Sequence, residues 1–163
     1  MKDMNAAVAD ATTRPVVALD VQYATGADGL PSAADFQRWA QAALDGRYDA
    51  AELVVRIVDA AEGRELNRRY RGIDRPTNVL SFPFEAPPGV VVDHLGDLVI
   101  CAPVVQREAR EQGKPEAAHW AHLTVHGVLH LLGYDHQDEA QAQEMEAMEK
   151  RILETLGYGD PYA

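Results

Sequence analysis

The chain has 163 residues, of which 47% are apolar and 25% charged, and its formal net charge is −11. This composition is typical of one soluble globular domain and excludes collagen-like, low-complexity and wholly disordered chains. The acidic balance argues against indiscriminate binding to nucleic acid or anionic membranes. No apolar run approaches the roughly 18 residues that span a bilayer, and no apolar signal segment opens the chain. Because Cys101 is the single cysteine, we expect no internal disulfide and a reducing, cytoplasmic location.

The N-terminal half of the sequence predicts strands that alternate with helices. Residues 1–14 lack apolar periodicity, and we expect a flexible leader before a single domain at residues 15–163. The predicted elements are a strand at residues 16–22, a helix between Ser32 and Gly46, a strand at residues 52–58 and a helix at residues 60–70. The strands are rich in β-branched residues. The helices have apolar side chains three and four apart and follow the N-cap candidates Ser32 and Asp59.

The C-terminal half predicts a pair of strands followed by helices. Strands at residues 79–84 and 95–101 are separated by a short segment, which favours antiparallel pairing because parallel neighbours need a long crossover. Helices are predicted at residues 103–112, 115–132 and 138–156, and each is followed directly by a glycine. The order β-α-β-α-β-β-α-α-α predicts an α+β domain in which about five helices cover a small mixed four-stranded sheet.

The segment HLTVHGVLHLLGYDH, residues 122–136, combines histidines with the end of a predicted helix. His126 and His130 are four residues apart, so on a helix they share one face with Cβ atoms roughly 6 Å apart. Gly133 can adopt the left-handed conformation that ends a helix, which lets the chain reverse and return His136 to the same place. Three imidazoles suit zinc and leave one position of a tetrahedral ion open, as in catalytic sites. The pattern therefore predicts a Zn²⁺ centre at the end of a central helix.

The same histidine spacing is found in metzincin proteases, whose motif is H-E-x-x-H-x-x-G-x-x-H. This favours a zinc peptidase, but Gly127 stands where those proteases carry their general-base glutamate. Glycine cannot accept a proton, so Gly127 argues against peptide hydrolysis by that mechanism. Gly127 either permits close approach of a neighbouring strand or a substrate, or it serves close packing alone.

HGVLHLLGYDH, residues 126–136, resembles the H-G-x-L-H-L-x-G-Y-D-H signature of the YbeY family of bacterial endoribonucleases. The similarity extends to YRGIDRPTNVLSFPF at residues 70–84, to LGDLVIC at residues 95–101 and to a downstream helix with Met145, Glu146 and Glu149. It covers most of the chain from about residue 50 onward and leaves out the N-terminal leader.

The resemblance implies a single-strand-specific ribonuclease with one zinc ion. The implied ligands are His126, His130 and His136, and the implied catalytic arginine is Arg71. The resemblance also implies roles in 3′ maturation of small-subunit ribosomal RNA and in ribosome quality control. The expected partners are single-stranded ribosomal RNA and the ribosome or its small-subunit proteins, with no membrane involved.

The segment RELNRRYRGIDR, residues 64–75, is basic within an acidic chain, with five arginines against two acids. A guanidinium binds phosphate oxygens in a planar, bidentate manner, and a local basic patch suits a selected RNA segment. Arg71, next to Gly72 at the start of a turn, is therefore expected to act on the phosphodiester. For Arg64, Arg68, Arg69 and Arg75 we favour a solvated helix face with surface ion pairs.

Several polar residues near the motif keep more than one interpretation. Asp135 either is catalytic, by orienting an imidazole or acting on water, or it stabilises the turn after the helix. His122, one turn before His126, could be a fourth ligand, but we favour a buried residue or one that supports the ligands. His94 and His119 are expected at the surface. The solvated face of the last helix carries acids that include Asp138, Glu139, Glu144 and Glu146. Because these acids would repel RNA, we predict that the substrate enters from the side of Arg71.

Three functions follow from these observations. The first is a metal-dependent endoribonuclease, in which the ion activates water or polarises phosphate while Arg71 stabilises developing charge. The second is a zinc peptidase, which Gly127 disfavours. The third is a non-catalytic ribosome-assembly factor with a structural zinc, which the open coordination position disfavours.

Overall fold

One mixed sheet organises the chain, with its strands in the order β1-β2-β4-β3. The computed structural model describes residues 15–163, so the expected leader at residues 1–14 lies outside the described part. The strands are β1 Val16–Ala24, β2 Ala50–Val58, β3 Val79–Pro83 and β4 His94–Cys101. β2 pairs in parallel with both β1 and β4, whereas β3 pairs antiparallel with β4. The expected mixed sheet and antiparallel pair are therefore confirmed, and β3 is an edge strand.

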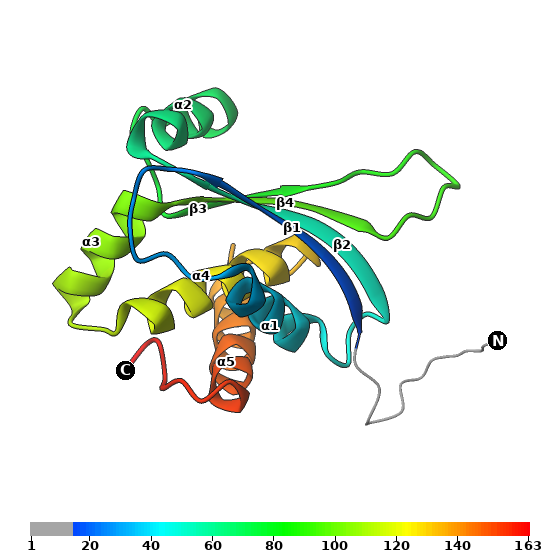
Figure 1. The fold of residues 1–163 in the computed structure, drawn as a ribbon. Coiled ribbons are helices and arrows are strands. Elements are labelled where there is room, and N and C mark those ends of the chain that lie inside the picture. Colours follow the sequence, from blue (N-terminus) through cyan, green and yellow to red (C-terminus); the bar gives the residue numbers. More distant parts are fainter. Residues whose placement is uncertain (1–14) are drawn as a thin grey trace.

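Helices cover both faces of this sheet. Within residues 15–163 they are α1 Ala33–Leu44, α2 Ala60–Arg71, α3 Ala102–Gln112, α4 Glu116–Leu131 and α5 Glu139–Thr155. Figure 1 shows α1, α4 and α5 on one side of the sheet and α2 on the other. The predicted α+β class is confirmed. Among the described helices, none combines the length and apolarity that crossing a membrane requires.

The two residues predicted to cap the first two helices differ in what their side chains do. The hydroxyl of Ser32 accepts the N–H of Asp35 at 3.2 Å, and the Asp35 carboxylate accepts the N–H of Ser32 at 3.0 Å. This reciprocal pair is a capping box, which confirms Ser32 as N-cap. Asp59 also lies at an N-cap position, but its carboxylate makes no capping bond there. It accepts hydrogen bonds from the Thr25 hydroxyl and the Gly26 N–H instead.

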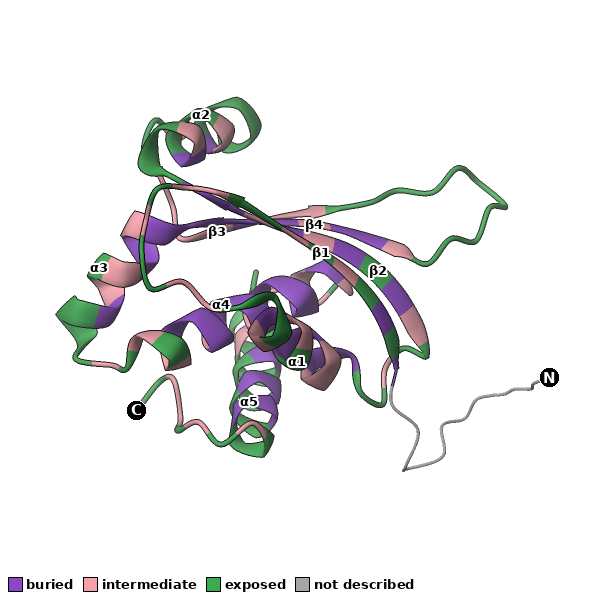
Figure 2. Ribbon diagram, viewed as in Figure 1, coloured by how far each residue is buried: buried purple, intermediate pink, exposed green. Residues whose placement is uncertain are grey.

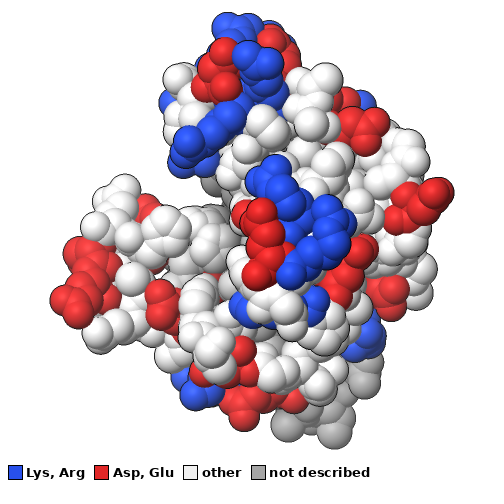
Figure 3. Space-filling view, turned by 90° about the vertical axis from the view of Figure 1, so that its left-hand side faces the viewer, with Lys and Arg blue, Asp and Glu red and all other residues white. Residues whose placement is uncertain are grey.

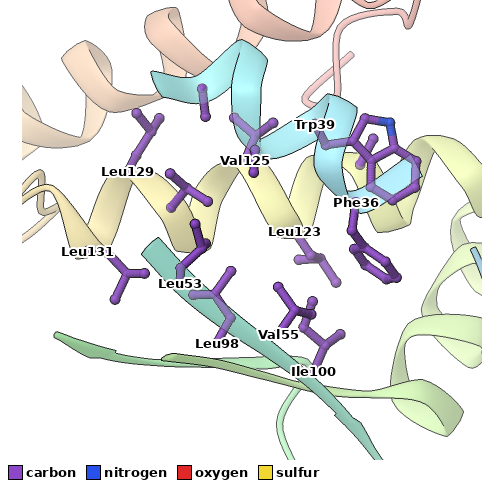
Figure 4. Close-up of a cluster of buried hydrophobic side chains, with 14 of the residues drawn as sticks. Phe36, Trp39, Leu53, Val55, Leu98, Ile100, Leu123, Val125, Leu129 and Leu131 are labelled. Carbon is purple, nitrogen blue, oxygen red and sulfur yellow. The ribbon is translucent and has the colours of Figure 1, made fainter. Parts of the chain in front are cut away.

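The main core lies between the sheet and α4, which is the central helix. Figure 4 shows leucine, valine and isoleucine side chains of β2 and β4 pointing toward those of α4. Figure 2 shows α4 largely buried and α2 largely exposed. Burial of each such side chain contributes roughly 1.5–3 kcal/mol. This core therefore holds α4, with its histidines, in one place against β4.

A glycine brings α4 and β4 unusually close. A Cβ atom on Gly127 would lie 2.8 Å from Cδ2 of Leu98, which is fully buried. The close approach of a neighbouring strand, one of the roles expected for Gly127, is therefore confirmed. The backbone carbonyl of Gly127 also accepts the Ser81 hydroxyl at 3.3 Å, which ties α4 to the edge strand β3.

Candidate metal centre

The C-terminal part of α4 places two imidazoles side by side. His126 and His130 lie one helical turn apart, and their ring centroids are 4.6 Å apart at an interplanar angle of 74°. Both rings are half-buried, because the opposite face of the helix packs in the core. Burial and the neighbouring His126 and His136 lower the pKa of His130. This favours the neutral imidazole, which is the form that ligates metals.

The turn after α4 brings the third imidazole back to this pair. Gly133 has φ +100, a left-handed conformation that favours glycine, and the N–H of Tyr134 donates to Leu129 at the helix end. The chain then reverses, and the ring of His136 lies 5.7 Å from that of His126 and 5.1 Å from that of His130. One nitrogen of each ring lies within 4.8 Å of the others. The structure thus brings together the three histidines that the sequence singles out, and this donor set fits one zinc ion.

A buried carboxylate supports this cluster from α5. Glu149 has no exposed surface, and it accepts hydrogen bonds from Nδ1 of His126, from Nε2 of His122 at 3.2 Å and from the Tyr162 hydroxyl. Engaging Nδ1 fixes the ring of His126 and leaves Nε2 for an ion, which is how carboxylates orient metal-binding histidines. The sequence indicates this residue only weakly, as one acid on the apolar stripe of Met145 and Ile152.

Opposing effects set the acidity of Glu149. Burial alone raises its pKa, but hydrogen bonds from His122, His126 and Tyr162 outweigh this and hold the pKa at about 2. Burial and the neighbouring carboxylate raise the pKa of Tyr162, so its hydroxyl stays a donor. His122 contacts Glu149, in agreement with the supporting role expected for it, and one of its ring nitrogens also lies within 4.8 Å of a ring nitrogen of His126.

The expectation of a surface position for His119 is wrong. His119 is only 4% exposed, and its Nε2 lies 2.9 Å from Oε1 of Glu108 on α3. The same carboxylate accepts the side-chain amide of Asn78 at 3.1 Å, so it links the segment before β3 to α4. His94 is half-buried and lies 3.5 Å from Asp97.

The three histidines open into a cavity of about 540 Å³ that runs along the edge strand β3. Tyr70 and Arg71 at the end of α2 form another part of its wall, together with residues 77–82. α2 stops at Gly72, whose φ is +74, and the Asn67 side chain holds the following turn through the Arg75 carbonyl at 2.8 Å. The turn that starts at Gly72, as expected, thus places Arg71 on the same cavity as the histidines.

The arginines of α2 differ in their partners. Arg64 pairs with Asp74 at 2.7 Å, Arg68 with Glu65 at 2.8 Å, and Arg69 lies 3.9 Å from Glu65. The surface ion pairs expected for Arg64, Arg68 and Arg69 are confirmed, whereas Arg75 is exposed and has no ion pair within residues 15–163. Figure 3 shows blue and red side chains interleaved over α2 at the top of the view. Arg71 is exposed and has no ion-pair partner within residues 15–163. Its guanidinium is therefore available to a ligand in the cavity.

Asp135 lies in the turn between the helix end and His136. Its Oδ1 accepts the N–H of His136 at 2.7 Å, which stabilises the turn that returns this imidazole. The acids expected on a solvated face, Asp138, Glu139, Glu144 and Glu146, are all exposed. They lie outside the set of residues that lines the cavity.

Comparisons with known proteins agree with this geometry. A family model described as endoribonuclease YbeY matches residues 26–157. A protein of Alkalilimnicola ehrlichii named endoribonuclease YbeY is 63% identical, over 98% of this chain and 97% of its own length. The solution structure of TM1509 from Thermotoga maritima superposes with a TM-score of 0.59 at 27% identity, covering 82% of this chain and 87% of that one. The chain belongs to the YbeY endoribonuclease family.

Proposed function

We propose that this protein is a zinc-dependent endoribonuclease that cleaves single-stranded RNA. The observation that carries the proposal is the cavity shared by Arg71, which has no ion-pair partner among residues 15–163, and three histidine nitrogens within 4.8 Å of one another. His126, His130 and His136 would hold the ion. Membership of the family supports RNA as the substrate, and a cavity whose lining within residues 15–163 includes no acid supports entry of a phosphate chain from the side of Arg71.

When bound, zinc supplies a Lewis acid and a water of lowered pKa, which suits hydrolysis of a phosphodiester. Arg71 binds non-bridging phosphate oxygens and stabilises the charge that develops on them. Glu149 acts through His126, whose ring it orients. For Asp135 we favour support of the turn that positions His136 over a catalytic role, because its Oδ1 is already engaged by the backbone.

The finer biological role follows from the family resemblance. We propose that the substrate is small-subunit ribosomal RNA, that cleavage serves 3′ maturation and ribosome quality control, and that it occurs in the cytoplasm on the ribosome or with its small-subunit proteins. A chain of net charge −11 repels polyanions as a whole. A selected site on a ribosomal particle suits such a protein better than free RNA in general.

The peptidase alternative requires a proton acceptor, but this chain has Gly127 at the position where metzincin proteases carry their glutamate. Gly127 faces Leu98 in the core rather than the cavity, so a glutamate there would not fit without displacing β4. The assembly-factor alternative shares the zinc site with the proposal but does not cleave RNA. Both alternatives are separated from it by cleavage assays on defined variants.

The test compares wild type, His130→Ala, Arg71→Ala and Arg68→Ala for zinc content, folding and cleavage of single-stranded and duplex ribosomal RNA. Arg68 is the matched control, because it lies on the same helix but is paired with Glu65. We expect Arg71→Ala to keep zinc and lose about 10²–10³-fold in cleavage rate. We expect His130→Ala to lose both, and Arg68→Ala to resemble wild type.

Each alternative predicts a different result. Equal cleavage by all four proteins would contradict the proposal, since the activity would then come from elsewhere. Cleavage of casein but of no RNA would favour the peptidase. Support of ribosome maturation by a folded His130→Ala variant would favour the assembly factor.

A further inference from the structure

Two aromatic rings lie in the wall of the cavity beside Arg71. Tyr70 precedes Arg71 at the end of α2, and Phe82 comes from the edge strand β3. Their ring centroids are 5.0 Å apart at an interplanar angle of 68°, an edge-to-face pair. The Tyr70 side chain is 62% exposed. Large apolar surface exposed beside a charged, concave site is a feature of ligand contact.

The inner side of this pair is packed against the fold, although its outer surface is open. Phe82 packs against a buried cluster on the α2 side of the sheet that includes Val99 and Val104. The guanidinium of Arg69 lies 5.9 Å from the centroid of the Tyr70 ring, within the range of a cation–π contact. Within residues 15–163 the Tyr70 hydroxyl has no hydrogen-bond partner, so the fold does not use its polar end.

We infer that Tyr70 and Phe82 form a stacking platform for one unpaired base of the RNA, next to the phosphate that Arg71 binds. The inference rests on the proposed function and deepens it by naming how single strands are selected. Aromatic side chains stack on any base, because every base has a π-face. A base within a duplex is already stacked and paired, so only a single strand can present one to Tyr70 without a cost in unpairing.

Because the platform and the histidines line one cavity, their positions define a path for the bound strand across the edge of the sheet. The imidazoles come from α4 on one side of the sheet, and Tyr70 comes from α2 on the other, with β3 between them. A strand that crosses this edge would put a phosphate between Arg71 and the histidines while an adjacent base lies on Tyr70. The platform would thus fix the position of one nucleotide relative to the phosphate to be cut, whatever base that nucleotide carries.

The test measures binding of a 2′-O-methyl single-stranded oligonucleotide to the zinc-loaded protein, and a gel after each measurement checks that the oligonucleotide is intact. The probe carries the fluorescent base 2-aminopurine at successive positions. The variants are Tyr70→Ala, Tyr70→Phe and, as control, Tyr48→Ala, which removes a tyrosine that is also exposed but lies off this cavity. We expect quenching of 2-aminopurine at one position in wild type. Tyr70→Ala should abolish it and weaken binding about 5- to 100-fold.

The controls separate stacking from other effects. Tyr70→Phe keeps the ring and should stay within about twofold of wild type, as should Tyr48→Ala. Phe82→Leu keeps apolar packing without a ring and should also reduce quenching. Unchanged binding and quenching in Tyr70→Ala would overturn the inference while leaving the cleavage tests of Arg71 and His130 intact. Failure of wild type to bind or cut any single strand would overturn the proposed function as well.

Discussion

Substitution of Glu149 by glutamine removes a buried charge that three donors share, at almost unchanged volume. The pKa of Glu149 in the fold is about 2, against 4.5 for an ordinary glutamate, because hydrogen bonds from His122, His126 and Tyr162 outweigh the effect of burial. At about 1.4 kcal/mol per pKa unit, this difference corresponds to about 3 kcal/mol of folding free energy. We expect Glu149→Gln to lose about that much stability at neutral pH.

The pH dependence gives this prediction a second readout. Because the pKa of Glu149 is lower in the folded than in the unfolded chain, its stabilisation is complete above about pH 4.5 and is lost as the pH falls to about 2. The stability of wild type should therefore approach that of Glu149→Gln across this range. Urea unfolding of the metal-free proteins at neutral and acid pH measures the difference directly.

The same substitution should weaken zinc binding, since the amide no longer orients His126 as the carboxylate does. Loss of such a supporting carboxylate typically costs 10- to 100-fold in metal affinity. Competition with a chromophoric chelator measures this, and Glu144→Gln is the control because Glu144 is an exposed acid on the same helix. If Glu149→Gln binds zinc and unfolds as Glu144→Gln does, the reasoning about the buried carboxylate is wrong.

Substitution of two glycines by alanine should destabilise the protein for different reasons, backbone strain at Gly96 and side-chain crowding at Gly127. Gly96 has φ +145, and a Cβ there would overlap the Phe82 carbonyl oxygen and lie 2.9 Å from Cα of Pro83. We expect Gly96→Ala to cost about 3 kcal/mol or more in urea unfolding, and a cost under 1 kcal/mol would contradict this. Gly127→Ala gains about 1 kcal/mol of helix propensity but crowds Leu98. Gly127→Ala should lower the free energy of unfolding of the wild-type protein but raise that of the Leu98→Ala variant. If its effect is the same in both proteins, Leu98 is not crowded by the added Cβ.

The elements of the fold could be predicted because their signals are local. Each helix observed within residues 15–163 ends within one residue of its predicted bound, since Ser32, Gly113 and Gly133 mark the ends directly. The histidine cluster could be predicted for the same reason. His126 and His130 share a helix face, and a glycine turn of a few residues is enough to return His136.

The contacts of the supporting carboxylates could not be predicted, because packing between distant segments decides them. Glu149 reaches His126 only because α5 crosses α4, and the two residues are 23 positions apart in sequence. The surface position expected for His119 is wrong because α3 supplies a carboxylate, Glu108, beside it. A histidine at the start of a helix gives no local sign of such a partner.

The net charge of the chain and the local charge of its cavity have different effects on RNA binding. A net charge of −11 keeps the protein off polyanions in general, and paired arginines on α2 add little attraction because their acids sit 2.7–3.9 Å away. Arg71 is different, since the turn at Gly72 presents it to the cavity with no acid beside it among the described residues. On the two proposals above, an RNA segment would be held only where its phosphate contacts Arg71 and an adjacent base contacts Tyr70. Selectivity for an unpaired stretch would then follow from these two contacts rather than from overall electrostatic attraction.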